Sequence, residues 1–109
     1  MRDITLPEVW GPSAWYLIHH ITRNLITKSY EKEDVIDFFN ILWVFIPCAI
    51  CRNHYMEYVK KDPYINYVDD GKEIDKWGFE LHNKINKMLN KSIMSYEVFR
   101  KTYSKTPTS

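Results

Sequence analysis

EIDKWGFELHNKINKMLN, residues 73–90, carries the clearest structural signal in the chain. Its apolar side chains recur at spacings of three and four residues, as Ile74, Trp77, Leu81, Ile85 and Met88. Residues three or four apart share one face of an α-helix, so this pattern predicts an amphipathic helix. The apolar stripe has to be buried against other elements, which the rest of the chain must supply.

The same periodicity recurs on both sides of this stretch. It predicts three more helices, at about residues 10–27, 32–46 and 48–61. Pro12 lies near the start of the first one, where a missing backbone N–H costs little. Pro47 interrupts the second, and Asp62-Pro63 ends the third.

A polar loop at residues 62–72, closed by Gly71, leads into the helix at 73–90. Ser95 is the expected N-cap of a short last helix that runs to about Tyr103. The tail at 104–109 has no apolar residue and is expected to fray. No segment alternates as a strand does. We therefore expect an all-α fold, a four-helix bundle with a short fifth helix.

Length and charge exclude several classes of protein. With 109 residues the chain is expected to form one domain, residues 1–109, with its core at about 10–103. Its 15 basic and 14 acidic residues leave a net charge of +1, too little to favour nucleic acid or an anionic membrane. The longest apolar run, Ile41–Ile46, cannot span a bilayer. Residues 1–5 contain no apolar signal segment, so we do not expect secretion.

Glycine, cysteine and aromatic counts narrow the choice further. Three glycines cannot build a Gly-rich phosphate loop, which excludes Rossmann and P-loop folds. Two cysteines cannot staple a disulfide-rich mini-domain. Aromatic residues reach 16%, with four Trp and eight Tyr. So much flat apolar surface indicates either very tight packing or a flat ligand, and composition alone does not choose between them.

The strongest chemical motif is Pro47-Cys48-Ala49-Ile50-Cys51. Two cysteines three apart at a helix start can close a small disulfide. The unpaired N–H groups and the dipole of the helix stabilise a thiolate there. This combination suits a disulfide that is made and broken repeatedly.

Three other interpretations of this cysteine pair stay open. The cysteines could be two reduced core residues. They could bind structural zinc together with two histidines, but His54, His19, His20 and His82 match no common zinc spacing. A thioredoxin-like oxidoreductase uses the same pair, but it needs strands between its helices. We expect no metal, and the alternative function is a non-enzymatic helical interaction module with structural zinc.

Two further groups of residues could hold a flat, anionic ligand. His82 and Asn86 share a helical face beyond Trp77, and Lys87 and Lys91 follow on successive turns. In the first helix, Trp10 and Gly11 precede Trp15, which shares a face with His19. Taken alone, a solvated helical face and a helix start with two core tryptophans are the simpler interpretations.

Taken together and in this order, the three elements resemble the Erv/ALR family of FAD-dependent sulfhydryl oxidases. The family pattern places Gly-x-x-x-Trp-x-x-x-His on the first helix and Cys-x-x-Cys at the start of the third. On the fourth it places a Trp followed by His-Asn-x-x-Asn and later lysines. The resemblance covers about residues 10–103. The matching residues here are Gly11, Trp15, His19, Cys48, Cys51, His54, Trp77, His82, Asn83, Asn86 and Lys91.

The resemblance implies a thiol oxidase that makes disulfides in protein substrates and passes the electrons through FAD to dioxygen, giving hydrogen peroxide. It implies that Cys48 meets the substrate and that Cys51 faces the flavin. Adenosine and phosphate contacts would come from His82, Asn83, Asn86, Lys87 and Lys91. Trp10, Gly11, Trp15, His19, His54, Trp77 and Tyr103 would line the rest of the cofactor site.

The chain departs from the family pattern in ways that affect its expected partners. Pro12 stands where many members have Arg, and no cysteine is left for a shuttle pair, so any shuttle is another polypeptide. The Trp-Gly-Pro start, the small size and the absence of an expected targeting segment resemble the short viral members, which act in the host cytoplasm during virion assembly. The resemblance also implies a thioredoxin-like carrier and a noncovalent homodimer. Phe38, Phe39, Leu42, Trp43 and Phe45 offer the dimer a candidate face.

Overall fold

The computed structural model describes residues 7–26 and 30–103. All regular elements in this part of the chain are helical, as the sequence predicts. They are α1 (Pro7–Ile26), α2 (Lys32–Phe45), α3 (Ala49–Lys61), the short 3₁₀ helix η1 (Tyr64–Asn66), α4 (Gly71–Met88) and α5 (Tyr96–Tyr103). The predicted fraying at 104–109 lies outside the described residues.

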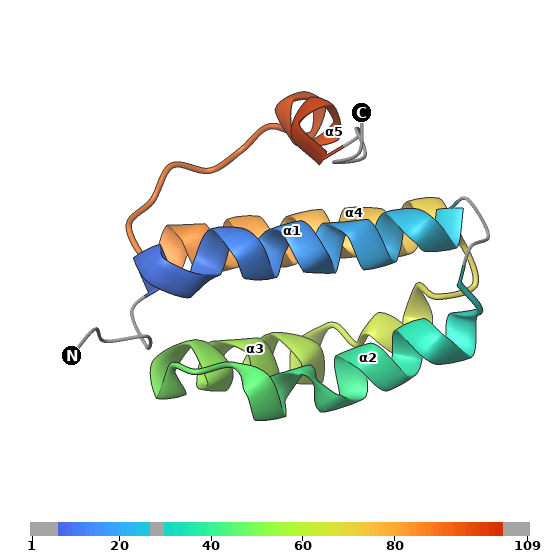
Figure 1. Ribbon diagram of the computed structural model, residues 1–109, viewed down its shortest axis with the longest axis horizontal. Coiled ribbons are helices and arrows are strands. Elements are labelled where there is room, and N and C mark those ends of the chain that lie inside the picture. Colours follow the sequence, from blue (N-terminus) through green and yellow to red (C-terminus); the bar gives the residue numbers. More distant parts are fainter. Residues whose placement is uncertain (1–6, 27–29, 104–109) are drawn as a thin grey trace.

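The helices form two layers (Figure 1). In one layer α1 and α4 run antiparallel, and in the other α2 and α3 do the same. The segment after α4 crosses to the opposite side of the first layer, where α5 lies. The core between the two layers is centred on Phe39 of α2 and on Ile74, Trp77 and Leu81 of α4, each at most 2% exposed.

The helices α1 and α4 approach each other most closely at one end of the molecule. A Cβ atom on Gly71 would lie 2.6 Å from the Cα atom of Ile26, so only glycine fits at this position. Further along α4, Gly78 faces Thr22. A Cβ atom built on Gly78 would lie 3.6 Å from Cγ2 of Thr22, an ordinary contact distance. This end of the α1–α4 layer is therefore closed by backbone packing.

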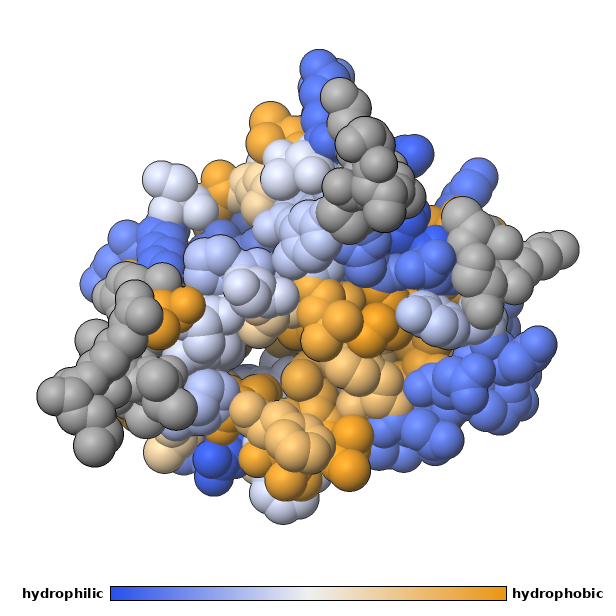
Figure 2. Space-filling view, in the orientation of Figure 1, coloured by the Kyte–Doolittle hydropathy of each residue, from blue (hydrophilic) through white to orange (hydrophobic). Residues whose placement is uncertain are grey.

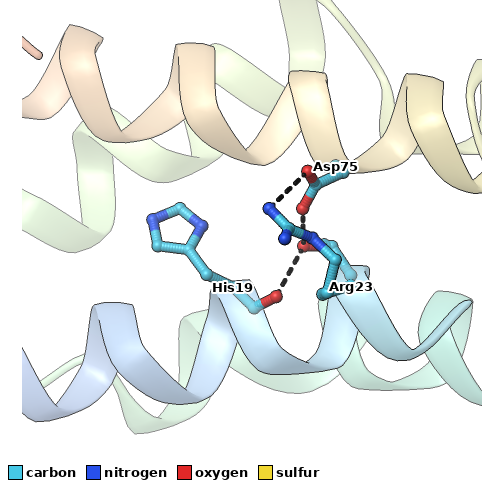
Figure 3. A network of polar contacts seen from close by, with 4 residues as sticks. His19, Arg23 and Asp75 are labelled. Atoms are coloured by element: carbon cyan, nitrogen blue, oxygen red, sulfur yellow. Dashed lines mark hydrogen bonds and ion pairs between the residues drawn. The ribbon is translucent and has the colours of Figure 1, made fainter. Parts of the chain in front are cut away.

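A buried ion pair joins the same two helices (Figure 3). The Arg23 guanidinium of α1 donates to the Asp75 carboxylate of α4 at 3.0 Å, and the Thr22 hydroxyl bonds the other carboxylate oxygen at 3.1 Å. Asp75 is 1% exposed. Arg23 also lies over the ring of Phe99, 5.7 Å from its centroid, and so links α5 to the pair. A polar network thus fixes the register of α1 on α4.

Capping residues set the helix ends, and several differ from the predicted bounds. The carboxylate of Asp70 accepts the N–H of Lys72, so α4 begins at Gly71, two residues earlier than predicted. It ends at Met88 because Asn90 adopts a left-handed φ of 58°. The Ser95 hydroxyl accepts the N–H of Val98, which confirms Ser95 as the cap of the last helix.

Two other expectations about the helices are wrong. α1 begins at Pro7, so Pro12 lies inside it rather than at its first turn. Met88 is 39% exposed rather than part of the buried stripe, because it occupies the last turn of α4, beyond the core.

The apolar face of α2 is only partly buried. Phe39 is 1% exposed, and Phe38 and Leu42 pack against the core. Ile41, Val44 and Phe45 remain 51%, 48% and 70% exposed. Figure 2 shows an apolar area at the lower edge of the molecule, over the region of α2, beside a hollow between the two layers.

Candidate functional site

A cavity of about 360 Å³ opens between the two layers, at the end of α1 and α4 away from the ion pair. It is lined by the first half of α1, the junction of α2 and α3, the second half of α4 and the segment after it, and by Tyr103 of α5. Its volume falls in the range of small-molecule and cofactor sites, about 300–1,000 Å³. Most of its wall is apolar, with a few polar groups.

The two cysteines stand on different sides of the cavity wall. Cys51, in the first turn of α3, is 4% exposed and lines the cavity. Cys48 is half-buried and does not line it. Cys48 is the N-cap of α3, and its Sγ accepts the backbone N–H of Cys51 at 3.5 Å. No disulfide joins the two cysteines in this structure.

The surroundings of the two sulfurs separate their pKa values. Burial works against a Cys48 thiolate. Hydrogen bonds from the backbone and thiol of Cys51 and from the backbone of Ile50, with the charge of Arg52, outweigh it and lower the pKa. Burial raises the pKa of Cys51 from 9.0 to about 11, and the adjacent Cys48 sulfur adds to the increase. Lys91 acts in the opposite direction on Cys51. The sulfur outside the cavity is therefore the better thiolate.

A stack of flat rings forms the α1–α4 wall of the cavity. The Trp15 indole lies on the His82 imidazole, with ring centroids 4.0 Å apart and planes 9° from parallel. His19 lies behind this pair, 0% exposed, and its Nε2 is 2.8 Å from Nδ1 of His82. Trp15 and His82 line the cavity, whereas His19 does not. One wall thus offers a flat surface for a planar ligand.

Both histidines in this stack are neutral at physiological pH. Burial lowers the pKa of His19 from 6.5 to about 2, with smaller contributions from His82, Arg23 and His20. Burial and the charge of Lys91 lower the pKa of His82 to about 4. An uncharged imidazole pair can hydrogen-bond a ligand without introducing a charge.

The segment after α4 supplies the cationic rim of the cavity. The left-handed turn at Asn90 returns the backbone N–H of Lys91 to the carbonyl of Asn86 at 2.8 Å. Lys91 is exposed at the cavity mouth, and Asn86 is 9% exposed within it. A cation and an amide at the mouth suit anionic groups such as phosphates.

Asn83 holds this segment in place. Its amide nitrogen donates to the carbonyl of Met94 at 2.7 Å, and its amide oxygen accepts the N–H of Met94 at 2.8 Å. Met94 lines the cavity, but Asn83 does not. Asn83 therefore acts on the cavity through the backbone that it binds.

Three other residues singled out from the sequence do not line the cavity. Trp77 is 2% exposed in the aromatic core, and its indole N–H donates to the carbonyl of Asp62 at 2.8 Å. Lys87 is exposed on the last turn of α4. His54 lies one turn after Cys51 in α3, half-buried, and its Nδ1 is buried without a hydrogen-bond partner among the described residues.

The sequence analysis did not assign to the cofactor site several apolar residues that line the cavity. Some of them share helix faces with Cys51 or His82 at spacings of three or four, which is the only signal that could have identified them. They are Ile18, Leu42, Ile46, Tyr55, Leu81 and Ile85.

FAD, which the family resemblance implies, fits these residues. Gly11 is buried in the wall, but a Cβ atom built on it would meet nothing within 4 Å. The wall therefore leaves open space beside the backbone, next to the Trp15–His82 stack. The apolar interior suits a flat ring system and the cationic mouth suits a pyrophosphate. Of the residues that the sequence analysis assigned to the cofactor, those that line the cavity and could hold it are Trp10, Gly11, Trp15, His82, Asn86, Lys91 and Tyr103.

A half-buried cysteine beside a buried one, facing a cofactor-sized cavity, defines a dithiol redox site on a helical scaffold. The sequence profile of the Erv1/Alr family matches residues 12–104, and the chain belongs to that family. Its relatives include the FAD-linked sulfhydryl oxidase of an African swine fever virus isolate, 29% identical over 99 residues, or 89% of this chain and 82% of that protein.

A second relative is the mitochondrial FAD-linked sulfhydryl oxidase of Saccharomyces cerevisiae. It is 29% identical over 94 residues, which make up 83% of this chain and 49% of the yeast protein. No solved structure gives a significant match. The resemblance drawn from the sequence motifs is confirmed.

The zinc-binding alternative finds no ligand set in the described part of the chain. Within residues 7–26 and 30–103, no three His, Cys, Asp or Glu side chains gather as a metal site requires. Among the same residues, no helix is both long enough and apolar enough to cross a membrane.

Proposed function

We propose that this chain is an FAD-linked thiol oxidase that forms disulfides in protein substrates. The observation that carries the proposal is the different position of the two cysteines relative to the cavity. Cys51 lines the cavity, whereas Cys48 lies outside it and is partly exposed. A protein thiol can reach only the outer sulfur, and a ligand in the cavity can meet only the inner one.

The exchange step follows from this placement. A substrate thiolate attacks Sγ of Cys48 in the oxidised Cys48–Cys51 pair, the S–S bond breaks, and Cys51 leaves as a thiolate. A second substrate thiolate attacks the substrate sulfur of the mixed disulfide and releases Cys48 as a thiolate. The substrate gains a disulfide, and two electrons remain on the enzyme's dithiol.

The pKa values favour the second step of this exchange, in which Cys48 is the leaving group. Hydrogen bonds at the α3 N-terminus make Cys48 the better leaving group when the second substrate thiol arrives, because they lower its pKa. The high pKa of Cys51 makes its thiolate a reactive electron donor inside the cavity. Lys91 is the cation that opposes this increase, so it stabilises the thiolate where it forms.

When bound, FAD would accept these two electrons and pass them to dioxygen, which becomes hydrogen peroxide. The chain's own groups hold and enclose the cofactor. Trp15 and His82 offer a flat face, Asn86 and Lys91 offer polar contacts at the mouth, and Trp10 and Tyr103 complete the wall. Trp77 supports this site from the core, and Asn83 supports it through Met94. Contacts from His54 and Lys87 require side-chain movement.

The test combines a spectrum with an activity. Purified protein is expected to be yellow and to consume oxygen with a dithiol substrate, forming hydrogen peroxide. Cys51→Ser should keep its flavin spectrum but lose turnover. Cys48→Ser should also lose turnover, and it should no longer form a mixed disulfide with the substrate. Normal dithiol oxidation by Cys51→Ser would refute the assignment of roles.

We further propose a noncovalent homodimer on the outward stripe of α2. Ile41 and Val44 are exposed at helical spacing, with Phe45, which also lines the cavity, exposed beside them. An exposed apolar stripe of this kind is typical of a contact surface. The sequence analysis included Phe39 and Trp43 in the candidate dimer face. Phe39 is buried in the core and cannot belong to that face, whereas Trp43 is 42% exposed and can. Ile41→Glu should convert a dimer to a monomer in analytical ultracentrifugation, whereas Asp37→Glu, an exposed control, should not.

The physiological substrate that we propose is the dithiol of a small thioredoxin-like carrier. The chain has no third cysteine that could act as its own shuttle, so the carrier is a separate polypeptide. We propose a role in the host cytoplasm or in the virion, on the ground of the resemblance to the short viral members of the family. The disulfide form of such a carrier should be trapped on Cys51→Ser: the Cys48 thiolate attacks the carrier disulfide, forms a mixed disulfide and releases the other carrier sulfur as a thiolate.

A further inference from the structure

One hydrogen bond joins the rings of His19 and His82, and its direction depends on the tautomers of the two rings. His19 Nε2 and His82 Nδ1 are 2.8 Å apart, so one of these two nitrogens carries a proton and the other accepts it. Both rings are deeply buried, at 0% and 6% exposed. Two neutral imidazoles can arrange this bond in two ways, and each way presents a different group to the cavity.

The free nitrogens of the two rings differ in their surroundings. Among the described residues, Nδ1 of His19 is buried and has no hydrogen-bond partner. His82 Nε2 is not enclosed in this way, because His82 lines the cavity. The direction of the bond therefore decides whether a proton lies on an enclosed atom or on one that faces a ligand.

Arg23 distinguishes the two arrangements. It follows His19 by one helical turn on α1, and its guanidinium is a permanent cation held by Asp75 at 3.0 Å. Figure 3 shows one ring nitrogen of His19 turned toward Arg23 and the other turned away. The nitrogen turned away is Nε2, which bonds His82, so the one on the Arg23 side is Nδ1. A lone pair is favoured beside a cation, and a proton is disfavoured.

The cost of unpaired groups points the same way. Buried N–H groups without an acceptor are rarer in proteins than buried acceptors without a donor. If His19 carried its proton on Nδ1, that N–H would be buried, unpartnered and directed toward a cation. With the proton on Nε2, His19 donates to His82 and leaves only a lone pair unpaired.

We infer that His19 is a positioning residue that donates from Nε2 to Nδ1 of His82, and so fixes His82 as the tautomer that presents an Nε2–H donor to the cavity. His82 then offers the bound ligand a hydrogen-bond donor and no acceptor. This role rests on the proposed function only in taking the ligand to be FAD, whose carbonyl, phosphate and ring-nitrogen acceptors match such a donor. The orientation of the His19–His82 bond itself does not depend on that assignment.

The direct test is long-range ¹H–¹⁵N NMR of the histidine rings in the full-length protein, which contains four histidines. His20→Gln and His54→Gln assign the signals by subtraction. Both His19 and His82 are expected to be neutral, with the proton on Nε2. A His82 ring protonated on Nδ1, or charged at neutral pH, would overturn the inference. This spectrum can be recorded whether or not the protein binds flavin. Absence of flavin binding would refute the proposed function, whereas the wrong tautomer of His82 would refute this inference.

A pair of variants tests whether His19 acts through His82. In His19→Gln the side-chain amide can take the place of the Nε2–H donor, whereas His19→Leu has no donor. Gln should retain the Nε2–H signal of His82 and bind FAD within about threefold of wild type. Leu should give a mixed tautomer and at least tenfold weaker FAD binding, measured by flavin fluorescence. His20→Gln is the matched control. Equal FAD affinity and an unchanged His82 tautomer in His19→Leu would contradict a positioning role.

Discussion

The two ends of the layer formed by α1 and α4 differ in packing: one is closely packed, and the other borders the cavity. At one end Gly71 packs against the backbone of Ile26, and Arg23 is paired with the buried Asp75. At the other end Gly11 leaves open space and the rings of Trp15 and His82 face a cavity. The comparison teaches that the closed end supplies rigidity, so that the open end can keep an apolar cavity without collapsing.

The largest effect is expected at the closed end. Asp75→Ala removes the carboxylate that satisfies both Arg23 and Thr22 and leaves a buried cation unpaired. Breaking a buried pair in this way costs about 3–5 kcal/mol of unfolding free energy. Denaturant unfolding measures it. Asp69→Ala removes the exposed partner of Lys32 and serves as the control, with no measurable change expected. Equal stability of the two variants would break the comparison.

The cysteines at the open end should differ strongly in their response to pH. The thiolate is the reactive form, and the pKa of Cys51 is raised from 9.0 to about 11. At pH 8 Cys51 therefore holds roughly 100-fold less thiolate than an unperturbed thiol. Because the pKa of Cys48 is lowered, Cys48 should be alkylated first as pH rises, and Cys51 only near pH 11. Mass spectrometry after pulse alkylation of the reduced protein tests this order, which the reverse sequence of labelling would refute.

Gly71→Ala is expected to cost about 1–3 kcal/mol of stability, because the new Cβ would overlap the backbone of Ile26. Gly78→Ala is the matched control on the same helix. Its Cβ would meet Thr22 at ordinary distance, and replacing a mid-helix glycine stabilises by about 0.5–1 kcal/mol. Thermal unfolding of the two variants should shift in opposite directions, and a shift in the same direction would show that the close approach is not limiting.

Asn83→Ala should affect both stability and cofactor retention. It leaves the backbone N–H and carbonyl of Met94 without their partner, at a cost of about 1–2 kcal/mol. Because the same segment carries Lys91 to the cavity mouth, flavin should dissociate faster. Asn53→Ala, an exposed change on α3, is the control. Unaltered flavin retention in Asn83→Ala would show that the segment needs no support from this side chain.

The smallest effect on stability is expected for Gly11→Ala. Its Cβ would project into open space, so the helix should gain about 0.5–1 kcal/mol rather than lose any. The same methyl group occupies room beside the ring stack, and flavin affinity should fall severalfold. A stable variant with weaker flavin binding would sharpen the contrast with Gly71→Ala. Unchanged affinity would show that the space beside Gly11 is not used.

The sequence predicts the helices well because their apolar residues recur at helical spacing, and their ends carry Pro47, Pro63 and Ser95. It predicts less well which side chains meet the cavity. Trp77 shares a helix with His82 and is equally flat, but it lies in the core, where Asp62 accepts its N–H. The neighbouring helices determine which face of α4 packs on α2 and which face borders the cavity. The spacing of residues within α4 alone cannot predict this.

Asn83 is a second residue whose role in the site cannot be predicted from its spacing in the sequence. Its place in His-Asn-x-x-Asn predicts a ligand contact, and its amide instead binds the backbone of Met94, eleven residues later. A side chain that secures a loop and one that touches a ligand have the same residue type and the same spacing. They are told apart only when the loop's path is known.

The sulfur of Cys48 caps the start of α3, and in the proposed mechanism it also takes part in the exchange. As a thiolate it accepts the N–H of Cys51 with a full negative charge, and in a mixed disulfide it accepts the same group as a neutral atom. The first turn of α3 therefore senses whether a substrate is attached. Strengthening of that turn on release of the product would add to the driving force for letting the oxidised partner go.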